Sequence, residues 1–275
     1  MAVSGVTGGK ATIDKAIILA AGMGKRIAGL AGAPPKPLLP LDDTGGLTFI
    51  DWHLRVLHAR GARSIYLVGN PTTFGTATAA MGTIPATWIL NDFAGDQSGS
   101  GHSAYLAFTS EHGILDGQSR VVLMDADVVY DPTLLAELGS APTPKSKTLV
   151  CGKYRETDEE VLVFCDGQGV PRVQGKGLAG TPMVRGSRCL GEATGLLLLE
   201  PQDHDLWLRA AAWCMKFSTA GTRSEHEDIT GRLLAIGALD AVVFADDARY
   251  LECDTPDEYE AVKREMVPRW IGSLP

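Results

Sequence analysis

The sequence predicts an α/β fold, with a doubly wound, mostly parallel sheet and a small antiparallel extension. As far as residue 138, short apolar runs alternate with segments of helical spacing, which is typical of parallel strands joined by helices. Beyond residue 138, apolar runs follow one another across turns without intervening helices, which indicates antiparallel strands. Because α/β folds of this length often form one unit, we expect a single domain over 15–275 after a flexible, small-residue tail over 1–14.

The first half of the chain carries the alternating pattern. Lys15–Ala20 is a continuous apolar run that ends near glycines, as expected of a strand buried on both faces. Ile50, Leu54 and Leu57 show the spacing of one helix face. We therefore predict strands over 15–20, 64–68, 87–90 and 120–124, and helices over 50–58 and 103–108.

The second half predicts the antiparallel extension and the closing helices. Two turn sequences, Asp166-Gly167 and Gly175-Lys176-Gly177, separate its apolar runs. Pro201 stands at a first-turn position, and acidic residues after it with a lysine at the far end complement a helix dipole. We predict strands over 148–154, 160–165, 193–199 and 248–252, helices over 201–216, 228–236 and 256–266, and a surface loop over 140–147.

Composition limits the classes of partner. With 25 Lys+Arg against 33 Asp+Glu the net charge is −8, which disfavours nucleic acid and anionic membranes, since both reward clustered cations. No apolar run approaches the length of a membrane span, and the first residues lack the apolar core of a secretion signal. The five cysteines are odd in number and include no C-x-x-C pair, so we expect reduced thiols in a cytoplasmic protein.

A glycine-rich segment directly follows the first predicted strand. In Leu19-Ala-Ala-Gly-Met-Gly-Lys-Arg26, the glycines permit a sharp turn that brings N–H groups to an anion, and the two cations suit polyphosphate oxygens. The segment lacks the third glycine of a dinucleotide-binding G-x-G-x-x-G loop, and it does not match a Walker loop. It therefore indicates a different kind of phosphate-binding loop. The alternative is a tight turn with exposed basic residues.

Prolines flank a lysine ten residues after Arg26, in Pro34-Pro-Lys-Pro37. Proline restricts its own backbone and that of the preceding residue, so we expect Lys36 to lie in a stiff, extended segment. A lysine held in this way loses little entropy when it binds an anion opposite the glycine-rich segment. An ordinary surface lysine is the alternative.

Together, these segments resemble the signature of the sugar-phosphate nucleotidyltransferase superfamily, L-A-A-G-x-G-x-R followed by P-K-P-L. Further matches lie at Asn91-Asp92 and over 99–107, 124–127, 225–228 and 251–259, so the resemblance spans nearly the whole chain. The Asp-Ala-Asp motif and the helix after Asn91-Asp92 are most similar to small bacterial cytidylyltransferases of the phosphocholine, phosphonate and inositol-phosphate type. The resemblance implies a Rossmann-like nucleotidyltransferase fold, similar to GT-A, whose antiparallel extension covers the acceptor site.

The resemblance also implies the reaction. A phosphate or phosphonate oxygen of a small acceptor attacks the α-phosphorus of a nucleoside triphosphate, with CTP favoured, and pyrophosphate leaves. No general base is required because this oxygen is already anionic near pH 7. Relatives are often dimers, so a homodimer is an expectation. The alternatives are a sugar-1-phosphate nucleotidyltransferase, a D-x-D nucleotide-sugar glycosyltransferase and a homologue that binds nucleotide without turnover.

Two acidic residues indicate a Mg²⁺ site. Asp125 and Asp127 follow a buried strand, at the edge of the sheet where ligands gather, and their alternate spacing lets them point the same way. By resemblance Asp127 is the direct metal ligand and Asp125 supports it. A second ligand must come from a distant segment. The resemblance favours Asp228, with Asp254 as the alternative; either aspartate could instead cap a helix.

The resemblance assigns the remaining roles. Lys36, Arg26 and Lys25 would be catalytic, and Lys36, Arg155 and Lys176 would face the acceptor. Apart from the resemblance, the carboxylate of Glu192 could face a cationic head group of the acceptor. The last three are weaker candidates, because Arg155 and Lys176 could be solvated and Glu192 could be structural. The nucleotide-binding residues would be Leu19, Ala20, Ala21, Gly22, Met23, Gly24, Lys25, Arg26, Asn91, Gly101, Ser103 and Asp125.

Overall fold

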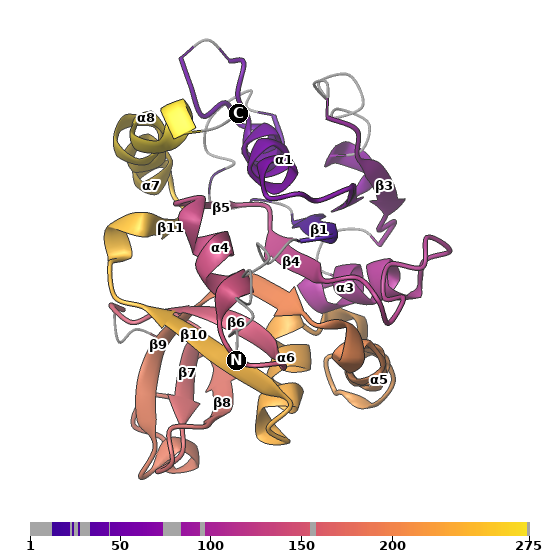
Figure 1. The fold of residues 1–275 in the computed structure, drawn as a ribbon, viewed down its shortest axis with the longest axis vertical. Helices are drawn as coiled ribbons and strands as arrows, with labels where there is room; N and C mark the ends of the chain where they lie inside the picture. Colours follow the sequence, from indigo (N-terminus) through magenta and orange to yellow (C-terminus); the bar gives the residue numbers. More distant parts are fainter. Residues whose placement is uncertain are drawn as a thin grey trace, which may run out of the picture.

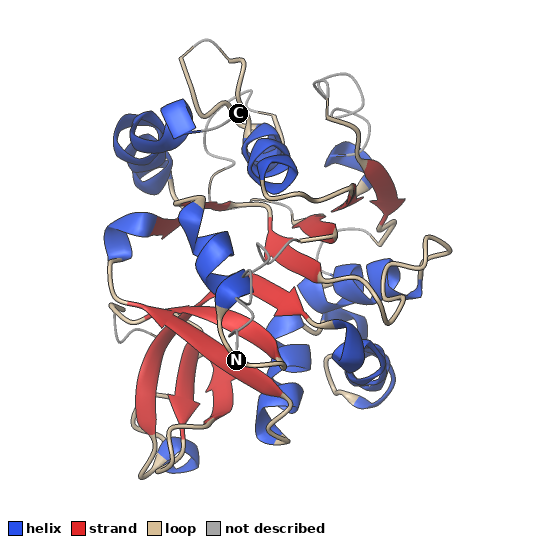
Figure 2. Cartoon of the chain, in the orientation of Figure 1, coloured by secondary structure: helices blue, strands red, loops and turns tan. Residues whose placement is uncertain are grey.

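The computed structural model describes residues 13–22, 24, 27, 34–43, 45–73, 84–93, 97–154 and 158–273. Their main feature is a mixed sheet with the strand order β10-β6-β9-β4-β1-β2-β3, which β7 and β8 extend beside β9 (Figure 1). Helices lie on both sides of this sheet (Figure 2). The predicted fold class, a mostly parallel sheet with an antiparallel extension, is confirmed.

The parallel half of the sheet is built on β1 (Lys15–Ala20), which pairs in parallel with β2 (Ser64–Gly69) and β4 (Val121–Asp125). Strand β3 (Thr87–Leu90) extends it beyond β2. Alternate residues of β1 pack on α1 (Phe49–Ala59) on one face and on α3 (Ser100–Thr109) on the other. This burial of both faces explains the continuous apolar run. The parallel pairing of β1 with β4 places the carboxyl ends of both strands at one edge of the sheet.

The antiparallel part is centred on β9 (Arg188–Leu199), which pairs with β4, β6 (Ser146–Cys151) and β7 (Leu162–Cys165). Two strands in this region are additional to those predicted. They are β8 (Pro171–Gly175), which forms a hairpin with β7, and β10 (Leu239–Phe244), which runs parallel to β6. The turn predicted at Gly175-Lys176-Gly177 begins at the last residue of β8.

The predicted surface loop over 140–147 is wrong at its end. Ser146 and Lys147 are fully buried residues of β6. The Lys147 ammonium lies 2.7 Å from a Glu200 oxygen, and the Ser146 hydroxyl donates to Asp203 at 2.8 Å. Polar residues that indicate exposure in a sequence can be buried when each has such a partner.

A second, two-stranded sheet pairs β5 (Val128–Tyr130) with β11 (Tyr250–Glu252) in antiparallel fashion, and it lies beside the end of β4. None of the described helices has the length and apolar character needed to cross a membrane. The remaining α-helices are α4 (Thr133–Ser140), α5 (His204–Phe217), α6 (His226–Ala235), α7 (Pro256–Ala261) and α8 (Val267–Trp270). Short helical turns are η1 (Lys36–Leu38), η3 (Pro182–Val184), η4 (Pro201–Asp203), η5 (Gly221–Arg223), η6 (Asp247–Arg249), the π-helical η7 (Val262–Met266) and η8 (Ile271–Ser273).

Candidate active site

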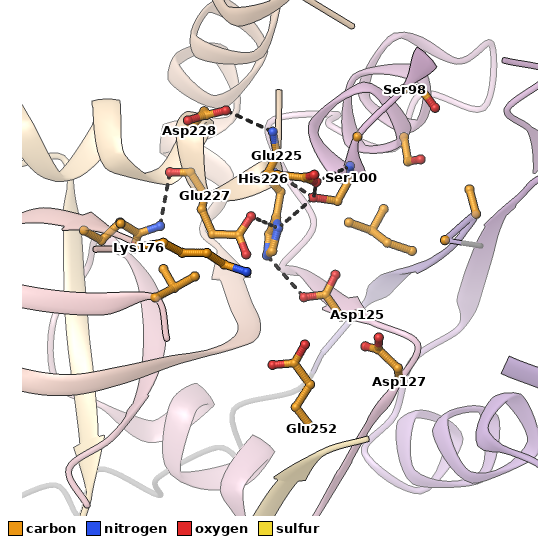
Figure 3. Close-up of a pocket in the computed structure, with 18 residues that line it drawn as sticks. Ser98, Ser100, Asp125, Asp127, Lys176, Glu225, His226, Glu227, Asp228 and Glu252 are labelled. Atoms are coloured by element: carbon orange, nitrogen blue, oxygen red, sulfur yellow. Dashed lines mark hydrogen bonds and ion pairs between the residues drawn. The ribbon is translucent and has the colours of Figure 1, made fainter. Parts of the chain in front are cut away.

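Two adjoining cavities open at the carboxyl ends of β1 and β4. One has a volume of about 500 Å³ and the other about 310 Å³, and Leu19, Gly22, Asp127 and Glu225 line both. Figure 3 shows the larger cavity, around which the labelled acidic side chains converge from separate segments. This is the edge of an α/β sheet at which ligands are expected.

The glycine-rich segment forms one wall. Leu19, Ala20, Gly22 and Gly24 line the smaller cavity, and Ala21 lines the larger one. Gly24 has a φ of +56°, and a Cβ built on it would lie 2.9 Å from the Cβ of Lys36, so both the backbone conformation and the close packing favour glycine. Met23, Lys25 and Arg26, which the sequence predicts to bind nucleotide, lie outside the described residues.

Lys36 lies in the smaller cavity, opposite the glycine-rich segment. The expected extended segment ends at Pro35, and Lys36 begins the turn η1. The Lys36 ammonium lies 2.8 Å from an oxygen of Asp127 and 2.8 Å from an oxygen of Asp254. Burial tends to lower the pKa of Lys36, but the two carboxylates outweigh it and raise the pKa above its usual value. The lysine therefore stays charged.

Asp127, Glu252 and Asp254 form an acidic group whose oxygens lie within 4.8 Å of one another. Pairing of β5 with β11 creates this group, because Glu252 is opposite Val128 and the Cys253 N–H donates to the Asp127 carbonyl at 2.9 Å. Glu252 is exposed on one side, but partial desolvation by the surrounding protein, and then repulsion by Asp127, Asp254 and Asp125, raise its pKa to about 9. Among the described residues of this group, three carboxyl groups thus crowd around the single ammonium of Lys36.

Glu252 was not predicted. One feature of the sequence could have indicated it: Glu252-Cys-Asp254 repeats the acidic spacing of Asp125-Ala-Asp127. In an extended strand, residues spaced in this way lie on the same side. The pairing that brings the two motifs together joins segments far apart in the sequence.

Asp228, the predicted second metal ligand, lines the larger cavity but is not a member of this acidic group. Its carboxylate accepts the Glu225 N–H at 2.9 Å, and with Glu225 it forms a capping box at the start of α6. Of the two candidates that the sequence offered, the structure brings Asp254 next to Asp127.

Asp125 lies at the end of β4 and faces a buried histidine that the sequence analysis did not select. His226 lies 3.5 Å from Asp125 and 2.8 Å from Glu227, as Figure 3 shows. Burial opposes a charge on the ring, but Asp125 and Glu227 raise the pKa of His226 to about 10. Burial in turn raises the pKa of Asp125 to about 7, partly countered by His226. The two neighbouring carboxylates account for the raised pKa of His226, whereas burial, and not the imidazolium, accounts for the raised pKa of Asp125.

The N-terminus of α3 forms the wall opposite Lys176. Glu225 accepts the Ser100 N–H at 2.7 Å and thereby satisfies the first turn of α3. A Cβ on Gly101 would lie 2.6 Å from the Ser224 carbonyl oxygen, so glycine is required for α3 and the segment before α6 to approach this closely. Ser103 lines the cavity, whereas Asn91 lies behind it and donates to the Ser103 hydroxyl at 3.0 Å.

Lys176 and Glu192 lie at the end of the site formed by the antiparallel strands. Lys176 lines the larger cavity, and both residues line a smaller recess of about 40 Å³ with Asp125 and Glu227. Arg155, the third residue predicted to face the acceptor, lies outside the described residues.

Comparisons with known proteins identify similar chains. A family model for the MobA-like NTP transferase domain matches residues 16–200. The inositol-1-phosphate CTP transferase from T. maritima has a TM-score of 0.67 and 16% identity, over 92% of this chain and 96% of its own. The CTP:phosphocholine cytidylyltransferase from Streptococcus pneumoniae has a TM-score of 0.69 and 15% identity, over 91% of this chain and 98% of its own.

A third solved structure is a Bacillus anthracis protein proposed to be a glucose-1-phosphate thymidylyltransferase, in complex with a sucrose. It has a TM-score of 0.67 and 17% identity, over 90% of this chain and 93% of its own. Curated protein sequences give no significant match. At identities this low, the structural likeness shows a shared fold.

Proposed function

Because the chain belongs to the MobA-like NTP transferase family, we propose that it joins CMP from CTP to a small phosphate or phosphonate acceptor. Family membership makes the protein a nucleotidyltransferase, and the solved structures confirm the predicted Rossmann-like fold with its antiparallel strands. One observation carries the proposal: Gly22, Gly24, Lys36, Asp127 and Asp254 line one cavity of about 310 Å³. A phosphate-binding turn, a lysine and metal-ligand carboxylates are the parts that such a transfer needs.

A divalent metal fits the acidic group. Asp127, Glu252 and Asp254 offer oxygen ligands, which Mg²⁺ prefers, and the raised pKa of Glu252 reflects a crowding of carboxyl groups that a bound cation would relieve. We therefore propose Asp127 and Asp254 as ligands, with Glu252 beside them, in place of the expected pair Asp127 and Asp228. When bound, Mg²⁺ supplies positive charge to the phosphates of both substrates.

The residues of the chain bring two polyanions together. The acceptor oxygen forms a bond to the α-phosphorus of CTP as the bond from this phosphorus to pyrophosphate breaks. In our proposal, the N–H groups of Gly22 and Gly24 face the leaving phosphates, and Lys36 exchanges its contacts with Asp127 and Asp254 for the α-phosphate. Charge neutralisation and alignment supply the acceleration, since the attacking oxygen needs no base.

In this proposal the two substrates bind at different walls of the larger cavity. The wall formed by Ser98, Gly99, Ser100 and Ser103 would contact the base through short side chains and backbone groups. The acceptor would then lie toward Lys176 and the hairpin of β7 and β8. Resemblance to cytidylyltransferases favours CTP, and two of the similar structures are described by their use of CTP.

Pyrophosphate release tests the proposal directly. CTP, UTP, GTP and ATP are each incubated with Mg²⁺ and one acceptor from a panel of phosphocholine, 2-aminoethylphosphonate, inositol 1-phosphate and glucose 1-phosphate. We expect release to be fastest with CTP and to require one of the first three acceptors. Preference for glucose 1-phosphate with another nucleotide would instead support a sugar-1-phosphate nucleotidyltransferase, and no release with any pair would overturn the proposal.

A further inference from the structure

His53 lies in α1, outside both cavities, and contacts the backbone of the Asp-Ala-Asp motif. Its Nε2 lies 3.2 Å from the carbonyl oxygen of Ala126, the residue between Asp125 and Asp127. We propose that His53 is a positioning residue, which fixes the peptide before Asp127 and thereby the direction of that carboxylate toward the metal. The inference rests on the proposed function, because it assigns Asp127 to the metal site.

The hydrogen bond to Ala126 determines the tautomer of the His53 imidazole. A carbonyl oxygen only accepts, so Nε2 must carry the proton that it donates to Ala126. The Nδ1 atom is buried and has no hydrogen-bond partner among the described residues. Burial lowers the pKa of His53 to about 4, so the ring is neutral near pH 7 and keeps this tautomer.

The ring is also held in place. It is fully buried and stacks on Tyr130, with centroids 5.7 Å apart and an interplanar angle of 27°. Tyr130 belongs to β5, the strand that directly follows the Asp-Ala-Asp motif and pairs with β11. The histidine therefore joins α1 to the two-stranded sheet that assembles the acidic group.

Three hydrogen bonds fix the three successive peptide groups around Asp127. The Ala126 N–H donates to the Leu19 carbonyl at 3.1 Å, and the Cys253 N–H donates to the Asp127 carbonyl at 2.9 Å. The peptide between them, whose carbonyl belongs to Ala126, is held by His53. Backbone groups supply the outer two bonds and cannot be removed by substitution, whereas the middle bond comes from a side chain and can be tested.

A positioning role for His53 and an ordinary core-packing role predict different effects of replacing it. A residue that only fills space changes stability when it is replaced. A residue that directs a metal ligand also changes metal affinity, and loss of such outer contacts typically costs 10–100-fold in affinity or activity. Gln and Met are similar in size, but only Gln keeps an N–H, so this pair separates the hydrogen bond from the packing.

His204 offers a matched control. It is also buried, with 3% of its surface exposed, and its Nδ1 accepts the Gly117 N–H at 2.9 Å. Like His53, it has one ring nitrogen without a hydrogen-bond partner among the described residues. His204 lies in α5 and lines neither cavity of the site.

The experiment compares His53→Gln and His53→Met with His204→Gln and His204→Met. Mn²⁺ affinity of the full chain, measured by electron paramagnetic resonance, is the main readout, with thermal unfolding and steady-state kinetics beside it. We expect His53→Met to weaken Mn²⁺ binding 10–100-fold and His53→Gln to recover most of this loss. Both His204 variants should bind Mn²⁺ as the natural chain does.

Equal Mn²⁺ affinities in His53→Met and the natural chain would overturn the inference, as would equal losses in the Met and Gln variants. If His53→Met does not fold, His53→Phe retains a ring against Tyr130 without the N–H and takes its place in the same comparison. The proposed function is judged separately, because it fails if the natural chain releases no pyrophosphate. The Mn²⁺ comparison decides the role of His53 independently of turnover, and a natural chain that binds no Mn²⁺ would overturn the inference as well.

Discussion

The ammonium of Lys36 lies 2.8 Å from a carboxylate oxygen of Asp127, although the two residues are 91 positions apart in the sequence. The same ammonium lies 2.8 Å from Asp254, so one lysine bridges two of the three carboxylates in the acidic group. Among the described residues, Lys36 supplies positive charge at that group. A metal and a triphosphate would therefore bind together most readily, because the phosphates accept the lysine as the metal takes the carboxylates.

Replacing Lys36 with Met should lower turnover at least 100-fold, since the variant keeps the volume of the side chain but removes the cation from the phosphates. Asp127→Asn should have an effect of similar size. Steady-state pyrophosphate release with saturating CTP and Mg²⁺ measures both. Circular dichroism and thermal unfolding serve as folding controls, and near-natural turnover in a folded variant would remove that residue from the mechanism.

The two candidate second ligands can be separated. Asp254→Asn should weaken Mn²⁺ binding at least 10-fold, because Asp254 lies within the acidic group. Asp228→Asn should leave Mn²⁺ affinity within about 2-fold and instead cost roughly 0.3–1 kcal/mol of stability, because Asn still accepts the Glu225 N–H but removes a negative charge from the N-terminus of α6. Metal titration and denaturant unfolding of both variants test this, and the reverse ranking in metal affinity would restore Asp228 as the ligand.

The wall at α3 depends on a glycine. Gly101→Ala places a methyl group 2.6 Å from the Ser224 carbonyl oxygen, so α3 and the segment before α6 must separate. We expect KM for CTP to rise at least 5-fold, because this wall would contact the base. Kinetics of Gly101→Ala beside Gly167→Ala provide the test, because Gly167 has no atom within 4 Å of its built Cβ and a φ outside the left-handed region. An unchanged KM in Gly101→Ala would contradict the assigned contact.

Stability at acid pH should depend on Glu200, which lies outside the site. Burial tends to raise its pKa, but hydrogen bonds from Arg120 and Lys147 lower it below the usual 4.5. A carboxyl whose pKa is lower in the folded state adds stability that is complete above its unfolded pKa and is lost as the pH falls below it. The free energy of unfolding should therefore fall more steeply between pH 5 and 3 in the natural chain than in Glu200→Gln.

At pH 7, Glu200→Gln should cost about 3–5 kcal/mol, because it leaves the fully buried ammonium of Lys147 without its ion pair. Lys147→Met should cost less, since Glu200 keeps Arg120 at 2.8 Å. Urea unfolding from pH 3 to 8 measures these differences. Parallel pH curves for the natural chain and Glu200→Gln would contradict the assigned ion pairs.

Much of the fold could be predicted because its signals are local. The apolar run of β1 and the glycines after it predict a buried strand and a phosphate-binding turn, and the structure places Gly24 against Lys36. Strand β10 was harder to recognise. It is an outer strand of the sheet, Asp240 interrupts its apolar run, and Val243 is 47% exposed, so it lacks the pattern of a strand buried on both faces.

The part of the candidate site that could be predicted also has local signals in the sequence. Asp125, Asp127 and Lys36 stand in motifs whose composition already indicates their chemistry, and the structure brings them to one edge of the sheet. Glu252 and His226 depend on pairing between distant segments, β5 with β11 and α6 with the end of β4. No local pattern specifies such pairings, so their side chains could be assigned only from the structure.

The central claim is that the glycine-rich turn, Lys36 and the acidic group hold one nucleoside triphosphate with its divalent ion. A crystal structure with CTP and Mn²⁺, with anomalous diffraction at the manganese edge, tests it most directly. We expect a single strong peak within ligand distance of Asp127 and Asp254, with the Lys36 ammonium moved onto a phosphate oxygen. A peak remote from both aspartates, with Lys36 still bridging them and the triphosphate bound elsewhere, would contradict the account.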